Sequence, residues 1–268
     1  MVKPKKIGPS IPRTVVAHMR ERYIVNFRLK PEALARHLPV PWLQPQVVNG
    51  WSVLSFCILK LNDLTLWPIP SIFGFSTLSC AYRVGVIDMS GDAPEPSVYV
   101  TDRNADLPVV IRTAPLLLAD AIPALKGHVR TGHGGTSISL TYMDGQPLFS
   151  GEMTTVPAFS SSVFGTLDDF AAFIKAGVSS YTPSVLPDAL ARVDLYKEDV
   201  EYRPLQAKVE VNSLDGVWPD AGLEYDSAVF ASGAKYMWSY RGLWSERTKR
   251  QLKERRPTVQ FDAVHARG

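Results

Sequence analysis

The chain has 268 residues, of which 46% are hydrophobic, 10% aromatic and 21% charged. This length and hydrophobic content suit a single domain with a sizeable core and exclude general disorder. The formal net charge is only +3 and many basic residues cluster near the two ends, which predicts solvated tails and no nucleic-acid surface.

The cysteines and the hydropathy of the sequence indicate what kind of protein this is and where it is located. Cys57 and Cys80 lie in apolar stretches without CxxC spacing, so we expect buried thiols. No window approaches a membrane span, and residues 1–13 lack the apolar core of a signal peptide, which predicts a cytoplasmic protein. We expect a flexible arm over 1–13, one domain over 14–243 and a basic tail over 244–268.

The N-terminal region predicts a strand, a helix and a second strand. Residues 14–29 alternate β-branched and aromatic residues with polar ones, which is typical of a long half-buried strand. Pro31 suits the first turn of a short helix that ends near Leu38, before two prolines. Residues 51–61 are apolar on both alternating faces, which predicts a strand buried on both sides.

The segment 64–75 is apolar, yet Pro68, Pro70 and Gly74 interrupt it, so it fits neither a helix nor a strand well. It is either a lid or wall over a pocket, or a buried loop or a subunit contact.

The rest of the chain is predicted to consist mainly of strands. They are expected at 78–88, 96–102, 136–142, 147–155, 192–201 and 226–240. Helices are expected at 115–125 and from Thr166 to near Gly177, where Thr166 and Asp169 form a capping box. Many strands, few helices and no βαβ alternation predict an α+β fold, mainly an antiparallel sheet or barrel with helices at its edge.

The sequence lacks the local signatures of the common phosphate, nucleophile-elbow and metal sites. The glycine-rich stretch 132–135 has no following helix and no nucleophile, so we interpret it as a flexible turn. His128 and His133 are five residues apart and have no third ligand at a suitable spacing. We therefore expect neither a metal nor another cofactor.

Residues 18–41 carry short motifs in a fixed order. They are His18-Met19-Arg20-Glu21-Arg22-Tyr23, Phe27-Arg28, Ala33-Leu34 and Leu38-Pro39-Val40-Pro41. This order resembles the opening of acetoacetate decarboxylases, in which an Arg-Glu pair starts a long strand and a short helix leads to a Pro-x-Pro.

Later motifs extend the pattern along the chain. They are Asn49-Gly50-Trp51 leading to Phe56, Tyr82-Arg83-Val84 followed by Pro96-Ser97-Val98-Tyr99-Val100, and Thr166-Leu167-Asp168-Asp169-Phe170 with Arg203-Pro204-Leu205 downstream. They are similar to an uncharacterised bacterial branch of the same superfamily, the YqjF-like proteins. The resemblance covers residues 15–240 and implies a cone-like antiparallel β-barrel that encloses a small-molecule cavity. A homo-oligomer is a further expectation.

The catalytic lysine of the family is missing where the pattern places it. In acetoacetate decarboxylases an Arg-Glu and then a Pro-Lys-Lys follow, and the first lysine attacks the substrate ketone while its neighbour lowers that lysine's pKa. Seven residues after Arg112 this sequence has Ala119 and Asp120. The nearest lysine, Lys126, lies seven residues late. We therefore predict chemistry without the family's Schiff-base lysine.

Five residues are candidates for the site. Arg20 matches the family arginine near the substrate carboxylate, or it is a surface arginine paired with an acid. Arg83 and Arg112 lie in apolar sequence, where a guanidinium needs an acidic partner or an anionic ligand. Asp120 is a candidate general acid or base, or a polar position on a half-exposed helix. Lys126 could form an imine or offset a helix dipole.

Two functions remain open at this point. The first is an enzyme that binds a small carbonyl or carboxylate compound inside the barrel and promotes lyase-like, decarboxylase-like or acid-base chemistry. The second is a non-catalytic protein that binds a small ligand on the same fold. Buried groups with strongly shifted pKa values around the cavity would favour the enzyme, and an all-apolar cavity would favour the binding protein.

Overall fold

The structure is a computed structural model that describes residues 13–186 and 189–245. Of the two expected tails, residues 1–12 and 246–268 lie outside the described part. Within it, no helix is long and apolar enough to cross a membrane.

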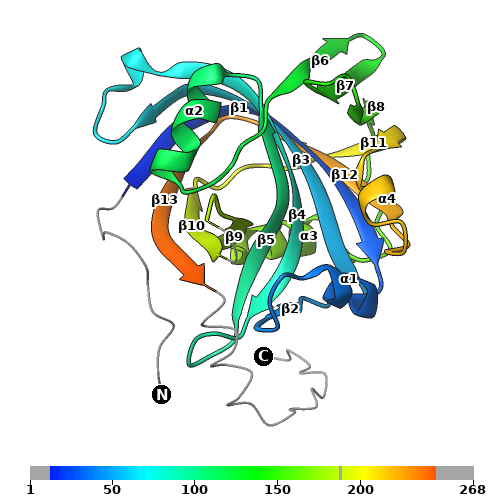
Figure 1. The fold of residues 1–268 in the computed structure, drawn as a ribbon. Coiled ribbons are helices and arrows are strands. Elements are labelled where there is room, and N and C mark those ends of the chain that lie inside the picture. Colours follow the sequence, from blue (N-terminus) through cyan, green and yellow to red (C-terminus); the bar gives the residue numbers. More distant parts are fainter. Residues whose placement is uncertain (1–12, 187–188, 246–268) are drawn as a thin grey trace.

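The described residues form one large sheet with a few short helices (Figure 1). The strands are β1 (Arg13–Leu29), β2 (Leu43–Pro45), β3 (Ser52–Leu66), β4 (Phe75–Asp88), β5 (Glu95–Ala105), β6 (Leu125–Gly132), β7 (Gly135–Tyr142), β8 (Pro147–Thr155), β9 (Ser179–Pro183), β10 (Ala189–Lys197), β11 (Arg203–Asn212), β12 (Glu224–Ala231) and β13 (Ala234–Ser245). The helices are α1 (Pro31–His37), η1 (Ser71–Phe73), α2 (Pro108–Leu117), α3 (Leu167–Ala176) and α4 (Leu214–Val217).

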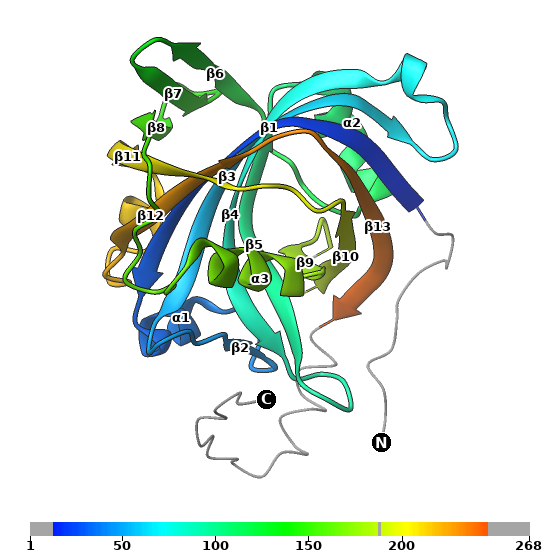
Figure 2. The same cartoon turned by 180° about the vertical axis from the view of Figure 1, so that it is seen from behind.

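Successive strand pairings in this sheet form a path that starts and ends at β1. From β1 the path runs through β3, β4, β5, β9, β10 and β13, and β13 pairs again with β1. The β5–β9 pair is parallel, whereas the other pairs of named strands are antiparallel. The path can return to β1 because β1 is long enough to pair with two strands along one edge. Its residues 13–19 pair with β13 and its residues 22–28 pair with β12. Beyond β12 the sheet continues through β11, β8, β7 and β6 (Figures 1 and 2).

Alternation along β3 supplies two separate hydrophobic cores. Leu54, Phe56 and Ile58 belong to the core that includes Phe149 of β8. Cys57, Leu59 and Leu61 point to the opposite face and belong to the core that includes residues of α2 and α3. Both helices therefore pack against the same face of the sheet, which we call the inner face.

Most of the predicted elements are confirmed. The predicted strands at 14–29, 51–61, 78–88, 96–102, 136–142 and 147–155 correspond to β1, β3, β4, β5, β7 and β8. The predicted capping box starts α3: the Thr166 hydroxyl accepts a hydrogen bond from the Asp169 amide at 3.1 Å, and the Asp169 carboxylate accepts one from the Thr166 amide at 2.9 Å.

The helix predicted at 115–125 is wrong. The helix in this region, α2, begins earlier at Pro108, whose ring suits the first helical turn. It ends at Leu117, and Ala119 then adopts a left-handed conformation with φ 54°. Pro123, which has no amide hydrogen, could not have continued a helix there. The chain instead becomes extended and enters β6.

Two further boundaries differ from the prediction. The strand predicted at 226–240 is two strands, β12 and β13, because the chain turns at Gly233 with φ 80°. The strand predicted at 192–201 begins at Ala189 and ends at Lys197. No strand was predicted at the positions of β2, β6, β9 and β11.

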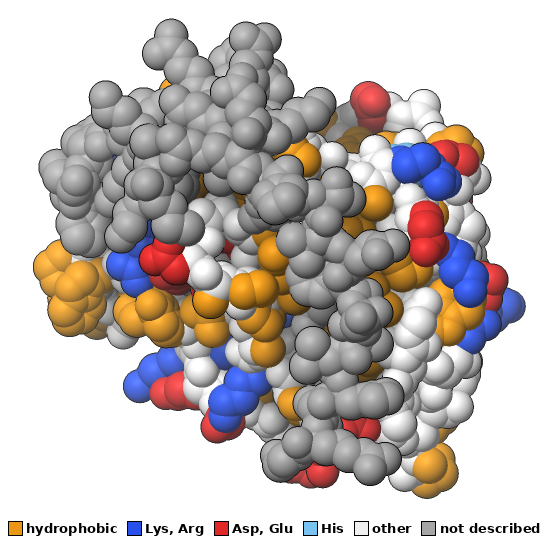
Figure 3. Space-filling model, turned by 90° about the horizontal axis from the view of Figure 1, so that it is seen from below, with side chains coloured by type: hydrophobic (Ala, Val, Ile, Leu, Met, Phe, Trp, Pro, Cys, Tyr) orange, Lys and Arg blue, Asp and Glu red, His pale blue; other side chains and the backbone are white. Residues whose placement is uncertain are grey.

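The surface shows no concentration of one charge on the face drawn in Figure 3. Where its residues are described, basic and acidic side chains lie beside one another among apolar ones.

Candidate functional site

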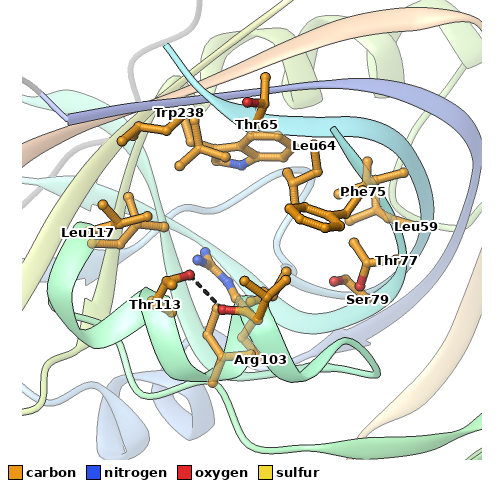
Figure 4. Close-up of a pocket in the computed structure, with 18 of the residues that line it drawn as sticks. Leu59, Leu64, Thr65, Phe75, Thr77, Ser79, Arg103, Thr113, Leu117 and Trp238 are labelled. Carbon is orange, nitrogen blue, oxygen red and sulfur yellow. Dashed lines mark hydrogen bonds between the residues drawn. The ribbon is translucent and has the colours of Figure 1, made fainter. Parts of the chain in front are cut away.

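A cavity of about 450 Å³ lies between the inner face of the sheet and α2. Its walls come from β3, β4, α2 and β13, and they include Leu59, Leu64, Phe75, Thr77, Ser79, Leu117 and Trp238 (Figure 4). Most of these side chains are apolar. The hydroxyls of Thr77 and Thr113 already donate hydrogen bonds within the protein, to Asp106 at 2.8 Å and to the Val109 carbonyl at 2.7 Å.

The cavity has an apolar rim. Ile69, Phe73 and Phe75 line it and are nevertheless 47%, 67% and 50% exposed, and Val109 of α2 also lines it and is 36% exposed. The segment 64–75, which fitted neither a strand nor a helix in the sequence, is therefore a wall of this pocket.

Arg83 is the unusual residue of the cavity. It lies on β4 opposite Ser55 and Val100, and its side chain also lines a second, smaller cavity of about 40 Å³. Among the described residues it has no hydrogen-bond or ion-pair partner, and its Nε is buried without one. Burial lowers the pKa of Arg83 to about 10, and the opposing effect of the nearby Cys57 does not make up for the loss of hydration.

The smaller cavity gathers polar residues from three other strands. Arg22 of β1, Cys57 of β3 and Lys197 of β10 line it together with Arg83. Arg22 is only 2% exposed. Its Nη1 donates to the Tyr236 hydroxyl at 3.0 Å and its Nη2 contacts the Cys57 sulfur at 3.5 Å, while its Nε has no partner in the described residues.

The cations shift the pKa values of their neighbours. Burial alone would raise the pKa of Cys57, but Arg22 and Arg83 outweigh it and the pKa is lowered. Burial lowers the pKa of Lys197 to about 7, and the same two arginines contribute to this shift. The Nζ of Lys197 donates to the Ile174 carbonyl of α3 at 2.7 Å.

Within the described residues, none of the hydrogen bonds of Arg22, Arg83 and Lys197 goes to a carboxylate. Three basic side chains of the described residues therefore share one interior region without a carboxylate bonded to them. Such an arrangement is costly unless an anion binds there, because a buried charge without a partner loses its hydration without compensation.

Asp120, a candidate from the sequence, lies beside the large cavity but is already engaged. It is 2% exposed and accepts hydrogen bonds from Arg103 at 2.9 Å and from Thr182 at 3.2 Å. Burial raises the pKa of Asp120 and Arg103 opposes this. Arg103 and Arg83 both line the large cavity. Asp120 neutralises the charge of Arg103, so of these two arginines only Arg83 lacks a partner in the described residues.

The structure does not bring the other three candidates to either cavity. Arg20 has a 66% exposed side chain 4.0 Å from Glu21, and Arg112 and Lys126 are exposed on α2 and β6. The position of Arg20 has a physical cause. The β1–β3 register shifts between Met19 and Glu21, so Arg20 is the extra residue of a bulge. The functional roles of these three residues stay predictions.

Sequence reasoning missed Arg22 and Lys197, although both carry a signal. Arg22 is two residues before the buried Ile24 and lies on the same face of β1. Lys197 likewise lies on the same face of β10 as the buried Val193 and Leu195. A basic residue in phase with a buried apolar face is a marker of an interior charge. Cys57 was expected to be a buried thiol, and this is confirmed.

No cluster of three or more potential metal ligands occurs in the described part of the chain. The basic groups around the smaller cavity also do not suit a cation.

No protein-family model and no curated protein matches the chain. Solved structures do match in fold. An acetoacetate decarboxylase from Legionella pneumophila subsp. pneumophila has a TM-score of 0.59 at 14% identity, covering 91% of this chain and 92% of that one. An acetoacetate decarboxylase-like enzyme from Sphingomonas wittichii RW1 has a TM-score of 0.55 at 14% identity, with coverage of 89% and 93%. The enduracididine biosynthesis enzyme MppR complexed with pyruvate has a TM-score of 0.53 at 13% identity, with coverage of 89% and 91%.

Proposed function

We propose that this chain, which has the fold of acetoacetate decarboxylase-like enzymes, is a small-molecule enzyme with lyase-like chemistry. It binds a carboxylate compound bearing a carbonyl group on the inner face of the sheet. The observation that carries this proposal is Arg83, a guanidinium that faces a cavity without a partner among the described residues. A planar guanidinium with free N–H groups is suited to a carboxylate.

The strand pairings support the cavity part of the proposal. Their circuit from β1 back to β1 is what the cone-like barrel of the resemblance requires, and the two cavities lie on its inner face. The structure of MppR with pyruvate illustrates that this fold accommodates a small keto acid. The later motifs of the sequence additionally favour the YqjF-like branch.

Lys197 supplies the reactive group in this proposal. With a pKa of about 7, a large fraction of the amine is neutral near neutral pH. Because the amine donates one hydrogen to the Ile174 carbonyl, its lone pair remains available. Lys197 thus provides the free amine that Ala119 and Asp120 cannot provide in place of the family's lysine pair.

The step that follows is imine formation. The amine nitrogen adds to the carbonyl carbon of the ligand, and one water leaves. The protonated imine then accepts the electron pair of a bond to the carbon next to the imine carbon, which is a C–H bond in a 2-oxo acid and the bond to a departing CO₂ in a 3-oxo acid. After the resulting enamine takes up a proton, water adds back and releases the product and the amine.

The enzyme is preferred over a non-catalytic binding protein because the cavity region is not all apolar. Groups with shifted pKa values, Arg83, Cys57 and Lys197, gather at the smaller cavity, and such clusters are typical of reactive sites. Fold likeness alone would not separate the two classes.

Borohydride trapping tests the proposal. The protein is incubated with pyruvate or another 2-oxo acid and reduced, and the adduct is located by mass mapping. We expect an adduct on Lys197 that is absent from Lys197→Arg. An adduct confined to Lys126 would contradict the role of Lys197. Keto-acid binding without any adduct, in the intact protein and in Lys197→Arg alike, would favour the binding protein.

A further inference from the structure

The large cavity exceeds what a small keto acid needs. A protein cavity of about 150 Å³ holds a benzene molecule. The present cavity of about 450 Å³ is three times as large, so by the same scale it has room for roughly eighteen non-hydrogen atoms. Pyruvate, with six, would leave most of it unfilled.

The chemistry of the walls is as informative as the volume. Of the two arginines that line the cavity, Arg103 is neutralised by Asp120 and only Arg83 lacks a partner in the described residues. Two of the wall hydroxyls are already used within the protein, those of Thr77 and Thr113. The cavity therefore offers one anion-binding group next to an extensive apolar surface.

The rim continues this apolar surface to the outside. Ile69, Phe73 and Phe75 line the cavity and are exposed to solvent. A ligand with an apolar chain could keep contact with apolar side chains from the rim to the interior. An entrance for a small, strongly hydrated acid gains nothing from such a rim.

We propose that the ligand of this site is an amphiphilic carboxylate, whose acid group binds Arg83 and whose apolar chain of roughly six to twelve carbons fills the 450 Å³ cavity towards the rim. This inference rests on the proposed function for the binding of the acid group by Arg83. It adds that the rest of the ligand is an apolar hydrocarbon chain. The segment 64–75 and α2 would then bind the hydrocarbon chain of the ligand.

The size of the effect follows from the burial of methylene groups. Each buried CH₂ contributes about 0.8 kcal/mol, which is about a fourfold change in the dissociation constant. In a straight-chain series, affinity should therefore rise about fourfold per carbon and level off once the cavity is full.

The experiment measures this series by calorimetry. Straight-chain 2-oxo acids from pyruvate to 2-oxohexadecanoate are titrated into the full-length protein below their micellar concentrations, together with the alcohol and methyl ester of one long member. We expect the rise and plateau described above for the acids, and at least tenfold weaker binding of the uncharged analogues.

Thr113→Trp tests where the chain lies. Thr113 lines the cavity from α2, so a tryptophan there should move the plateau to shorter chains. The control is Leu116→Trp on the same helix, because Leu116 is 69% exposed and does not line the cavity. Its plateau should equal that of the unaltered chain.

The outcomes separate this inference from the proposed function. Affinities that do not change with chain length, but still depend on Arg83, would overturn the apolar chain and leave the proposed function intact. Binding of the alcohol as tight as that of the acid would overturn the carboxylate anchor and with it both proposals. An equal plateau in Thr113→Trp and Leu116→Trp would remove the assignment of the chain to the α2 wall.

Discussion

Replacing Arg83 by Met should stabilise the protein and weaken ligand binding at the same time. The side chain of Met has nearly the length of the arginine stem, so the change removes the charge and leaves much of the packing. Folding lowers the pKa of Arg83 to about 10, because burial removes the hydration of its charge. The folded state therefore binds this proton less well than the unfolded chain, and the charge lowers stability at all pH values below 10.

The magnitude follows from this shift. At 1.36 kcal/mol per unit, the penalty is at most about 3 kcal/mol. Because Arg83 contacts cavity space that water can enter, we discount this to about 1–2 kcal/mol. For a domain of this size that corresponds to a rise in Tm of roughly 2–8 °C. Loss of charge-assisted hydrogen bonds to a carboxylate should weaken binding by about ten- to hundredfold.

The assay is thermal unfolding with and without a 2-oxo acid, together with calorimetric titration. Arg130→Met is the matched control, since Arg130 is exposed on β6 and should change neither property. A variant Arg83→Met that loses stability as an ordinary core substitution does, and retains the affinity of the unaltered chain, would refute the view of Arg83 as a cation kept for an anionic ligand.

Three further outcomes are expected. The yield of borohydride-trapped adduct should rise with pH and reach half its maximum near pH 7, because the pKa of Lys197 is about 7 and only the neutral amine above it attacks a carbonyl; a yield independent of pH between 5 and 9 would contradict this. Arg20→Met should leave keto-acid affinity unchanged in calorimetry, since Arg20 is exposed at a bulge, and a tenfold loss would restore it as a carboxylate ligand. Thr166→Ala should lower the free energy of unfolding by about 1 kcal/mol in urea titration, because α3 loses its capping box; an unchanged midpoint would contradict that role.

The elements of the fold could be predicted where local residue patterns determine them. The residue patterns of β1 and β3 and the capping box at Thr166 act over a few residues, and both strands and the capping box are confirmed. Residues 22–27 of β1, however, are buried on both faces, whereas the alternation predicted a half-buried strand. The helix predicted at 115–125 failed because its apolar residues were given more weight than Pro123 and the earlier start at Pro108. Which strands pair across the circuit depends on contacts between distant segments, and no local pattern encodes these.

Pairing between distant segments also decides which side chains enter the candidate site. Arg20 and Arg22 are two residues apart and would face the same side of a regular strand, but a bulge of one residue turns Arg20 outward and leaves Arg22 buried. The bulge is a property of the pairing between β1 and β3, so the sequence of β1 alone could not reveal it. Arg83 could be predicted because an arginine in apolar sequence needs a partner in any register. The same argument also pointed to Arg112, which is exposed on α2 because only one side of that helix packs against the sheet.

The missing lysine pair illustrates why a position in a motif and a position in space must be distinguished. In the motif, Ala119 and Asp120 stand where two lysines are expected, and the sequence there has no amine. What lowers the pKa of an amine, however, is burial near other cations, whatever strand they come from. Arg22, Arg83 and Lys197 meet those conditions from β1, β4 and β10, because the circuit of pairings brings these strands around one inner face. An amine suited to imine chemistry can therefore arise on this fold without the motif, and its position is set by the topology of the sheet.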